Sequence, residues 1–314
     1  FYAQANVPER LHYHENSDPG DHNYQLDNRQ QLYAFLEAHF FPERNLSAKE
    51  IDCDAEIFTH EDLIIPLPNA NENFHTLANN AVKSIESKPS QYDAPVNALA
   101  KLLRLPKYTM SADLFTGAKQ VGELSVRRLR LLSDDGLILP CVIVEPKDPI
   151  NTVTFISDKG FMSEHDRIAK LASLGNRVIA IDPVFIGQSR HTGSLYSMPM
   201  LAATLGQRPL GIQTAQVTSA VQFILRTLVL DHTDLESHGP RSGVLALTAA
   251  TTSEHIVEVS TVGALSSVDE LLSPTASYSK TPEAYCFGLL RWFKSPQVSE
   301  VLSNPIVNLK KHLK

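Results

Sequence analysis

The chain is predicted to fold as an α/β protein with a mostly parallel sheet and helices on both faces. Three observations predict this class. From residue 126 onward, short β-branched runs alternate with helical patterns, as in β-α units around a parallel sheet. A hairpin pattern precedes these units, with Ser133-Asp134-Asp135-Gly136 as its turn. The 314 residues, 43% of them hydrophobic, are enough to form a sizeable core.

The first elements of this pattern are a hairpin, a strand, a helix and a second strand. The helix is marked by Ile168, Leu171 and Ala172 at helical spacing, and Gly175 stands where its C-cap belongs. The predicted strands are Val126–Leu132, Leu137–Glu145, Thr152–Ser157 and Arg177–Ile181.

The pattern then continues with two further helix and strand units. Val217, Val221, Ile224 and Leu228 predict a long amphipathic helix. A short strand is expected to end near His238, a helix of small residues to follow Gly243, and a last strand to cover Ile256–Val262.

Residues 44–125 are predicted to form a connecting region. Short apolar runs alternate there with turn residues. A strand broken by proline is expected at Asp62–Pro66, and helices are expected at Phe74–Ile85 and Val96–Leu105.

Residues 1–43 have the pattern of the last pieces of a domain. A strand is expected within Ala3–Tyr13, followed by the polar loop Glu15–Tyr24 with Asp18-Pro19-Gly20 as turn chemistry. Leu32, Phe35, Leu36 and Phe40 then recur at helical spacing and predict a closing helix.

Composition excludes several classes of protein. The net charge is −7 and no Lys/Arg cluster appears, which argues against a nucleic-acid binder. No apolar run is long enough to predict a membrane span. Cys53, Cys141 and Cys286 are few, far apart and odd in number, so we expect free buried thiols rather than disulfides or a zinc site.

Three loops carry a family resemblance. Asp182-Pro183-Val184-Phe185-Ile186-Gly187-Gln188-Ser189 resembles the D-x-x-G-x-G-x-S turn of α/β-hydrolases. Asp158-Lys159-Gly160-Phe161 stands where that family has its oxyanion-hole loop, and the turn near Gly239 stands where the nucleophile elbow belongs. The resemblance covers about Val126 to Trp292 and implies an α/β-hydrolase-like fold.

The elbow lacks its nucleophile. The family motif is G-x-S-x-G, whereas alignment here puts Arg241 or Pro240 in the serine position. Ser242 and Ser237 lack the flanking glycines, so we interpret them as structural. The two further strands and the acid–His pair of the family are not identified after Val262, so residues 126–314 are interpreted as a degenerate hydrolase domain, incomplete at its C-terminal end.

His22 is the one candidate catalytic residue. Val7-Pro8-Glu9-Arg10, Asp21-His22-Asn23-Tyr24 and Asn28-Arg29-Gln30-Gln31-Leu32-Tyr33 resemble the end of acetyl xylan esterase and prolyl-oligopeptidase-like hydrolases. In these relatives an H-[DN]-Y loop carries the triad histidine. The resemblance implies that His22 is a general base, and that residues 1–43 are the tail of a hydrolase domain lying upstream of Phe1.

Together these features predict part of a tandem serine-esterase-type hydrolase. The resemblance implies acyl esters as substrates, with acetylated polysaccharide as the substrate class, and a secreted or periplasmic location. Expected partners are the upstream hydrolase domain and polysaccharide, and no metal or organic cofactor is implied. Two alternatives stay open: a non-enzymatic α/β-hydrolase-like binding or scaffolding module, and part of a prolyl-oligopeptidase-like serine peptidase.

Overall fold

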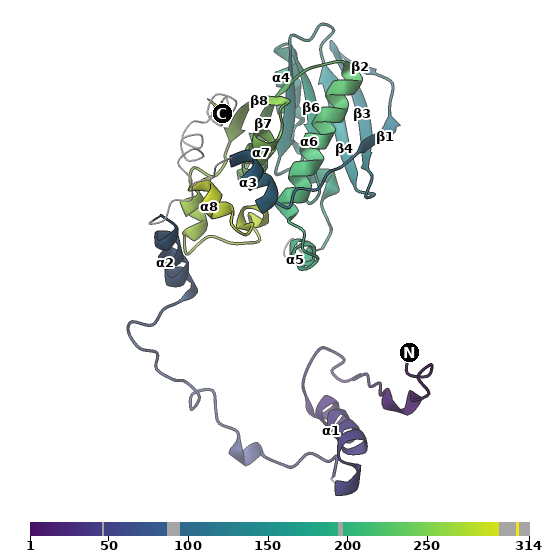
Figure 1. Cartoon of the computed structure of the whole chain (residues 1–314), viewed down its shortest axis with the longest axis vertical. Coiled ribbons are helices and arrows are strands. Elements are labelled where there is room, and N and C mark those ends of the chain that lie inside the picture. Colours follow the sequence, from purple (N-terminus) through teal and green to yellow (C-terminus); the bar gives the residue numbers. More distant parts are fainter. Residues whose placement is uncertain (46, 87–94, 194–196, 295–305, 308–314) are drawn as a thin grey trace. The chain divides into compact units, whose positions relative to one another are not determined.

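The computed structural model describes residues 1–45, 47–86, 95–193, 197–294 and 306–307 (Figure 1). The chain divides into two compact units, Phe1–Asn71 and Glu72–Lys314. The second unit contains the sheet and the buried core, and the turns between its strands and helices include those that resemble the α/β-hydrolase loops.

The described elements agree closely with most of the predicted ones. The helices are α1 Leu26–Phe40, α2 Phe74–Glu86, α3 Pro95–Leu102, α4 His165–Ser173, α5 Ser197–Thr204, α6 Pro209–Leu228, α7 Pro240–Thr252 and α8 Leu289–Phe293. The strands are β1 Met110–Phe115, β2 Lys119–Val121, β3 Leu124–Ser133, β4 Ile138–Glu145, β5 Asn151–Ser157, β6 Asn176–Ile181, β7 Thr233–His238, β8 Ile256–Val262 and β9 Ile306–Val307.

The strands form a single mixed sheet, with the order β1-β3-β4-β6-β5-β7-β8-β9 and β2 paired with β3. The predicted hairpin is the antiparallel pair β3 and β4. The strands β6, β5, β7 and β8 are parallel to one another, and the outer pairs are antiparallel. The predicted α/β class with an α/β-hydrolase-like sheet is confirmed, although only the central strands are parallel.

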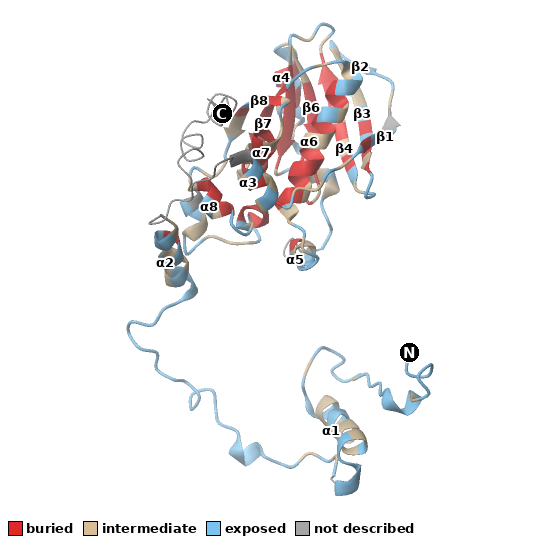
Figure 2. Cartoon of the chain, viewed as in Figure 1, coloured by how far each residue is buried: buried red, intermediate tan, exposed pale blue. Residues whose placement is uncertain are grey.

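Helices cover both faces of this sheet, as predicted. Alternate residues of β4 point to opposite faces. Leu139, Cys141 and Ile143 belong to the core cluster that includes α6 and α7, and Val144 belongs to the cluster formed with α4. In Figure 2 the buried residues follow the strands and the inner sides of these helices.

The sheet-bearing unit begins well before residue 126. The strand β1 pairs with β3, and Leu99, Leu103 and Met110 are buried in the main core. Part of the region 44–125 therefore packs with the sheet: Leu99 of α3 and the adjoining Leu103 belong to the core, and β1 and β2 pair with β3. The sequence pattern missed this because β1 is a short edge strand and α3 has only eight residues.

Two predicted strands are wrong. Residues 3–13 contain the 3₁₀ turn Pro8–Arg10, and residues 62–66 lie in turns and irregular backbone. Neither segment has a neighbouring strand among the described residues, and proline at positions 8 and 66 removes a backbone donor from any ladder. Both segments have the composition of a strand, but a strand also needs a neighbouring strand to form hydrogen bonds with.

The first unit has little core of its own. Among its described residues, none is buried, and the predicted closing helix α1 leaves Leu32 39% and Phe40 63% exposed. An ion pair between Arg29 and Glu50 fixes the helix to the chain that follows, with Nη2 2.6 Å from Oε1. Its order therefore depends on local polar contacts.

The core of the sheet should determine the stability of the second unit. Leu139→Ala removes a fully buried side chain and should lower the free energy of unfolding by about 2–5 kcal/mol in urea titrations. Leu205→Ala is the matched control, because Leu205 is 82% exposed, and it should change stability by less than about 0.5 kcal/mol. Equal effects of the two variants would contradict the described packing.

Candidate functional site

The turn between β7 and α7 has the shape of a strained strand-to-helix turn. Gly239 has φ +109° and ψ 165°, and α7 begins at the next residue, Pro240, rather than after Gly243 as predicted. In an α/β-hydrolase elbow the nucleophile sits on this strained turn. Gly239 is the residue at this point of the turn, whereas the alignments by sequence chose Arg241 or Pro240 for the nucleophile position.

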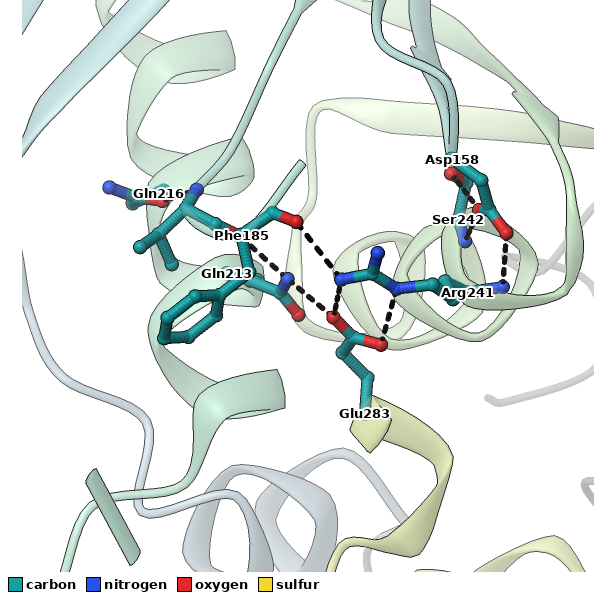
Figure 3. A network of polar contacts seen from close by, with 8 residues as sticks. Asp158, Phe185, Gln213, Gln216, Arg241, Ser242 and Glu283 are labelled. Carbon is teal, nitrogen blue, oxygen red and sulfur yellow. Dashed lines mark hydrogen bonds and ion pairs between the residues drawn. The ribbon is translucent and has the colours of Figure 1, made fainter. Parts of the chain in front are cut away.

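The Asp158 carboxylate occupies the space beside Gly239. A Cβ atom on Gly239 would lie 2.4 Å from Asp158 Cγ, so no side chain fits there without movement. Asp158 Oδ1 accepts hydrogen bonds from the Ser242 backbone N and from Ser242 Oγ, both at 2.6 Å, and Oδ2 accepts from Arg241 N at 3.2 Å (Figure 3). This carboxylate caps the first turn of α7.

Among the described residues, the turn at Gly239 presents no pair of free backbone N–H groups like the oxyanion hole of the α/β-hydrolase motif. In that family the backbone N–H after the nucleophile donates to the oxyanion. Here that residue is Pro240, which has no N–H. The next two N–H groups, of Arg241 and Ser242, already donate to Asp158. A substrate oxyanion would have to displace a fixed carboxylate to reach them.

Neither serine near the turn is placed for nucleophilic attack. Ser242 and Ser237 are both fully buried. The Ser242 hydroxyl donates to Asp158, and Ser237 Oγ has no hydrogen-bond partner within the described residues. A serine nucleophile needs a base in contact and access for the substrate, and the structure provides neither for Ser237.

The two predicted glycine loops meet beside this turn. The buried Asp182 carboxylate accepts hydrogen bonds from Phe161 N at 2.9 Å and Gln188 N at 2.8 Å. A Cβ on Gly160 would lie 2.3 Å from the Cα of Gly187, so the close approach requires glycine. Burial raises the pKa of Asp182, and the two amide hydrogen bonds oppose that shift. Asp182 therefore joins the two loops structurally.

A buried ion pair anchors the start of α7. Arg241 Nε donates to Glu283 Oε2 at 2.8 Å and Nη2 donates to Oε1 at 2.5 Å, while Nη2 also donates to the Phe185 carbonyl (Figure 3). Gln213 Nε2 donates to the same Glu283 oxygen at 3.0 Å. Glu283 belongs to the 3₁₀ helix Pro282–Tyr285, so these contacts join four separated segments: α7, this 3₁₀ helix, α6 and the loop at Phe185. No sequence pattern pointed to Glu283 or Gln213.

The histidine next to the turn belongs to a different polar group. His238 Nε2 lies 2.9 Å from Glu236 Oε1, and its Nδ1 lies 3.6 Å from Glu164 Oε2. Arg167 forms two hydrogen bonds with Glu236, and Ser157 Oγ donates to Glu164 at 3.0 Å. These contacts tie α4 and the turn before it to β5 and β7. No described hydrogen bond joins His238 to Ser237 or Ser242.

His22 lies in the first unit, on an exposed loop as the resemblance implies. It has no hydrogen bond or ion pair to any other described residue. Its histidine neighbours are engaged elsewhere: His14 Nε2 lies 2.8 Å from Asp27 Oδ2, and His12 Nε2 lies 2.9 Å from His39 Nε2. The structure brings neither a serine nor an acid to His22, so its catalytic role stays a prediction.

Other candidate chemistry is limited in the described part of the chain. No group of three or more His, Cys, Asp or Glu residues there could hold a metal ion. No helix among those residues is long and apolar enough to cross a membrane. The three cysteines are free thiols; Cys141 is buried, but Cys53 is exposed, contrary to expectation.

Comparison with known proteins gives similarity of fold alone. No family model matches the sequence. No curated protein matches it either. A provisionally named acetyl xylan esterase from Bacteroides fragilis matches with a TM-score of 0.48 and 9% identity, over 57% of this chain and 58% of that one.

Two further solved structures are acetyl xylan esterases. The enzyme from Paenibacillus sp. R4 has a TM-score of 0.46 and 13% identity, over 71% of this chain and 76% of its own. Acetyl xylan esterase 1 from Thermoanaerobacterium sp. has a TM-score of 0.41 and 13% identity, over 57% and 61%. The chain thus spans less than two thirds of the Bacteroides and Thermoanaerobacterium proteins.

Removing the carboxylate at position 158 should destabilise the domain. Asp158→Ala leaves two backbone donors and the Ser242 hydroxyl without their acceptor, so the free energy of unfolding should fall by about 2 kcal/mol. Asp148→Ala, at an exposed loop position, is the control and should stay within about 0.5 kcal/mol of the parent chain. Urea unfolding followed by circular dichroism measures both; an Asp158 effect no larger than the control would refute the capping role.

Proposed function

We propose that Glu72–Lys314 is a non-catalytic domain of an acyl-ester hydrolase. His22 is proposed to be the general base of a separate catalytic domain of the same protein. Acetylated polysaccharide is the proposed substrate class of that whole protein, and this part of the proposal rests on the family resemblance of the sequence around His22.

The turn at Gly239 is the observation that carries the first part. Three changes there act together: the strained position has no side chain, the following residue has no N–H, and Asp158 fills the adjoining space. Each of these alone would impair acyl transfer, because the reaction needs both a nucleophile and preformed oxyanion donors. Restoring a serine at position 239 alone would not restore a site.

The alternative is a module whose function is binding. An apolar groove on the face of the sheet that carries α4 favours it as a second candidate. The two proposals are compatible for this domain, since a non-catalytic domain can bind a ligand. A peptidase as the whole protein is the other alternative, and the substrate preference of the full-length protein distinguishes it from an esterase.

The isolated chain should not hydrolyse p-nitrophenyl acetate. Release of nitrophenol should equal the buffer rate at every protein concentration, because Ser237 and Ser242, the serines beside the turn, are buried and neither is hydrogen-bonded to a described histidine. Ser242→Ala and Ser237→Ala are the matched controls and should give the same rate. A burst of nitrophenol that disappears in either variant would show that the domain is catalytic.

In the full-length protein His22 should be indispensable to esterase activity. His22→Ala should lower kcat/KM for an acetyl ester by about a thousandfold or more, as when a triad member is lost. His14→Ala is the control, because His14 pairs with Asp27 instead, and it should cost far less. A His22→Ala rate within about threefold of the parent would reduce His22 to a loop histidine.

A further inference from the structure

An apolar groove runs along the α4 face of the sheet within the described residues. It has a volume of about 810 Å³ and lies over β3 and β4, beside α4. Cavities of about 300–1,000 Å³ are typical of small-molecule sites. Phe161 and Gln188 line this groove, whereas Asp158, Arg241 and Ser242 do not. The groove is therefore separate from the turn at Gly239.

Both walls of the groove are apolar. Val126, Val142 and Val144 line one wall from β3 and β4, and Phe161 and Ile168 line the other from α4 and the turn before it. The α4 helix packs on β6 and β4, and its Ile168 and Ala169 border the groove beside β3. Apolar side chains on both sides of the groove suit a hydrocarbon group, because burying it removes apolar surface of both partners from water.

The end of the groove nearest the carboxyl ends of the parallel strands is cationic. Arg128 and Arg130 line it from β3, paired in register with Val142 and Pro140. Arg130 forms an ion pair with Asp113, and both side chains are about half exposed. Arg128 is exposed, and its guanidinium has no hydrogen-bond or ion-pair partner within the described residues.

We propose that this groove binds an amphipathic monocarboxylate, with the aliphatic chain between the two apolar walls and the carboxylate on Arg128. The guanidinium offers planar paired donors that match a carboxylate. The volume and the single unpaired cation fit a small anion with one hydrocarbon chain. This ligand class goes beyond the proposed non-catalytic role and does not require any hydrolysis by the domain.

Isothermal titration calorimetry of the whole chain with octanoate, decanoate and dodecanoate, each below its micelle concentration, tests the proposal. Binding should saturate at one ligand per chain. Each step of two methylenes should tighten Kd roughly tenfold, given the transfer free energy of a methylene. Absence of saturable binding by all three acids would overturn the proposal.

Variants separate the two parts of the site. Arg128→Ala should weaken the binding of decanoate at least tenfold. The affinity for 1-decanol should stay unchanged, because the alcohol has no charge. Arg226→Ala is the matched control, since Arg226 is an exposed arginine on α6, which packs on the other face of the sheet. Val142→Trp should weaken the binding of both ligands, because the larger side chain fills part of the groove. Melting curves by circular dichroism verify that each variant is folded.

Two other outcomes would overturn the proposal. Equal decanoate affinity in Arg128→Ala and the parent chain would mean that the groove is only an apolar surface. A second copy of the chain is the other possible occupant of an apolar face. Concentration-dependent dimers in sedimentation that Val142→Glu abolishes and decanoate does not dissociate would assign the groove to that contact.

Discussion

The arrangement of the elbow depends on one interaction, the Asp158 carboxylate against the first turn of α7. A helix begins with backbone N–H groups that lack intrahelical acceptors, and an anion satisfies them well. Here the anion is an internal side chain that accepts from Arg241 N, Ser242 N and Ser242 Oγ. Its position requires glycine at 239, since any Cβ would meet the carboxylate. It also makes Pro240 acceptable at the helix start, because no N–H is needed there. Three residues that look unrelated in the sequence thus form one structural solution.

The Arg241–Glu283 pair extends the same logic. A charge this deeply buried is tolerated only with its counter-charge and further hydrogen bonds, and Glu283 and the Phe185 carbonyl provide them. The guanidinium projects from the first turn of α7 and is held by internal partners, while in the family this position belongs to a small residue. Both charged contacts bind the turn at Gly239 to the rest of the domain.

The sequence predicted the regular parts of the fold well and the site only partly. The hairpin, the strands β5 to β8 and the helix α6 are confirmed. Each has a strong periodic or β-branched pattern that lies entirely within its own segment. The start of the domain was missed because β1 is recognised only through its pairing with β3. Glycine motifs located the loops at Gly160 and Gly187, whose close approach the structure shows. The sharp turn at Gly239 and its contact with Asp158 were not predicted. The first depends on a backbone angle, and the second spans 84 residues to Ser242, which no local pattern encodes.

The most direct test of the central claim is labelling with a fluorophosphonate, followed by intact-mass and peptide mass spectrometry. The reagent forms a stable adduct with a serine only when that serine is accessible and activated. With Asp158 closing the turn and both nearby serines buried, the chain should show no adduct within Glu72–Lys314 after prolonged incubation. A stoichiometric adduct on Ser242 or Ser237, lost in the corresponding alanine variant, would contradict the account and identify a working nucleophile.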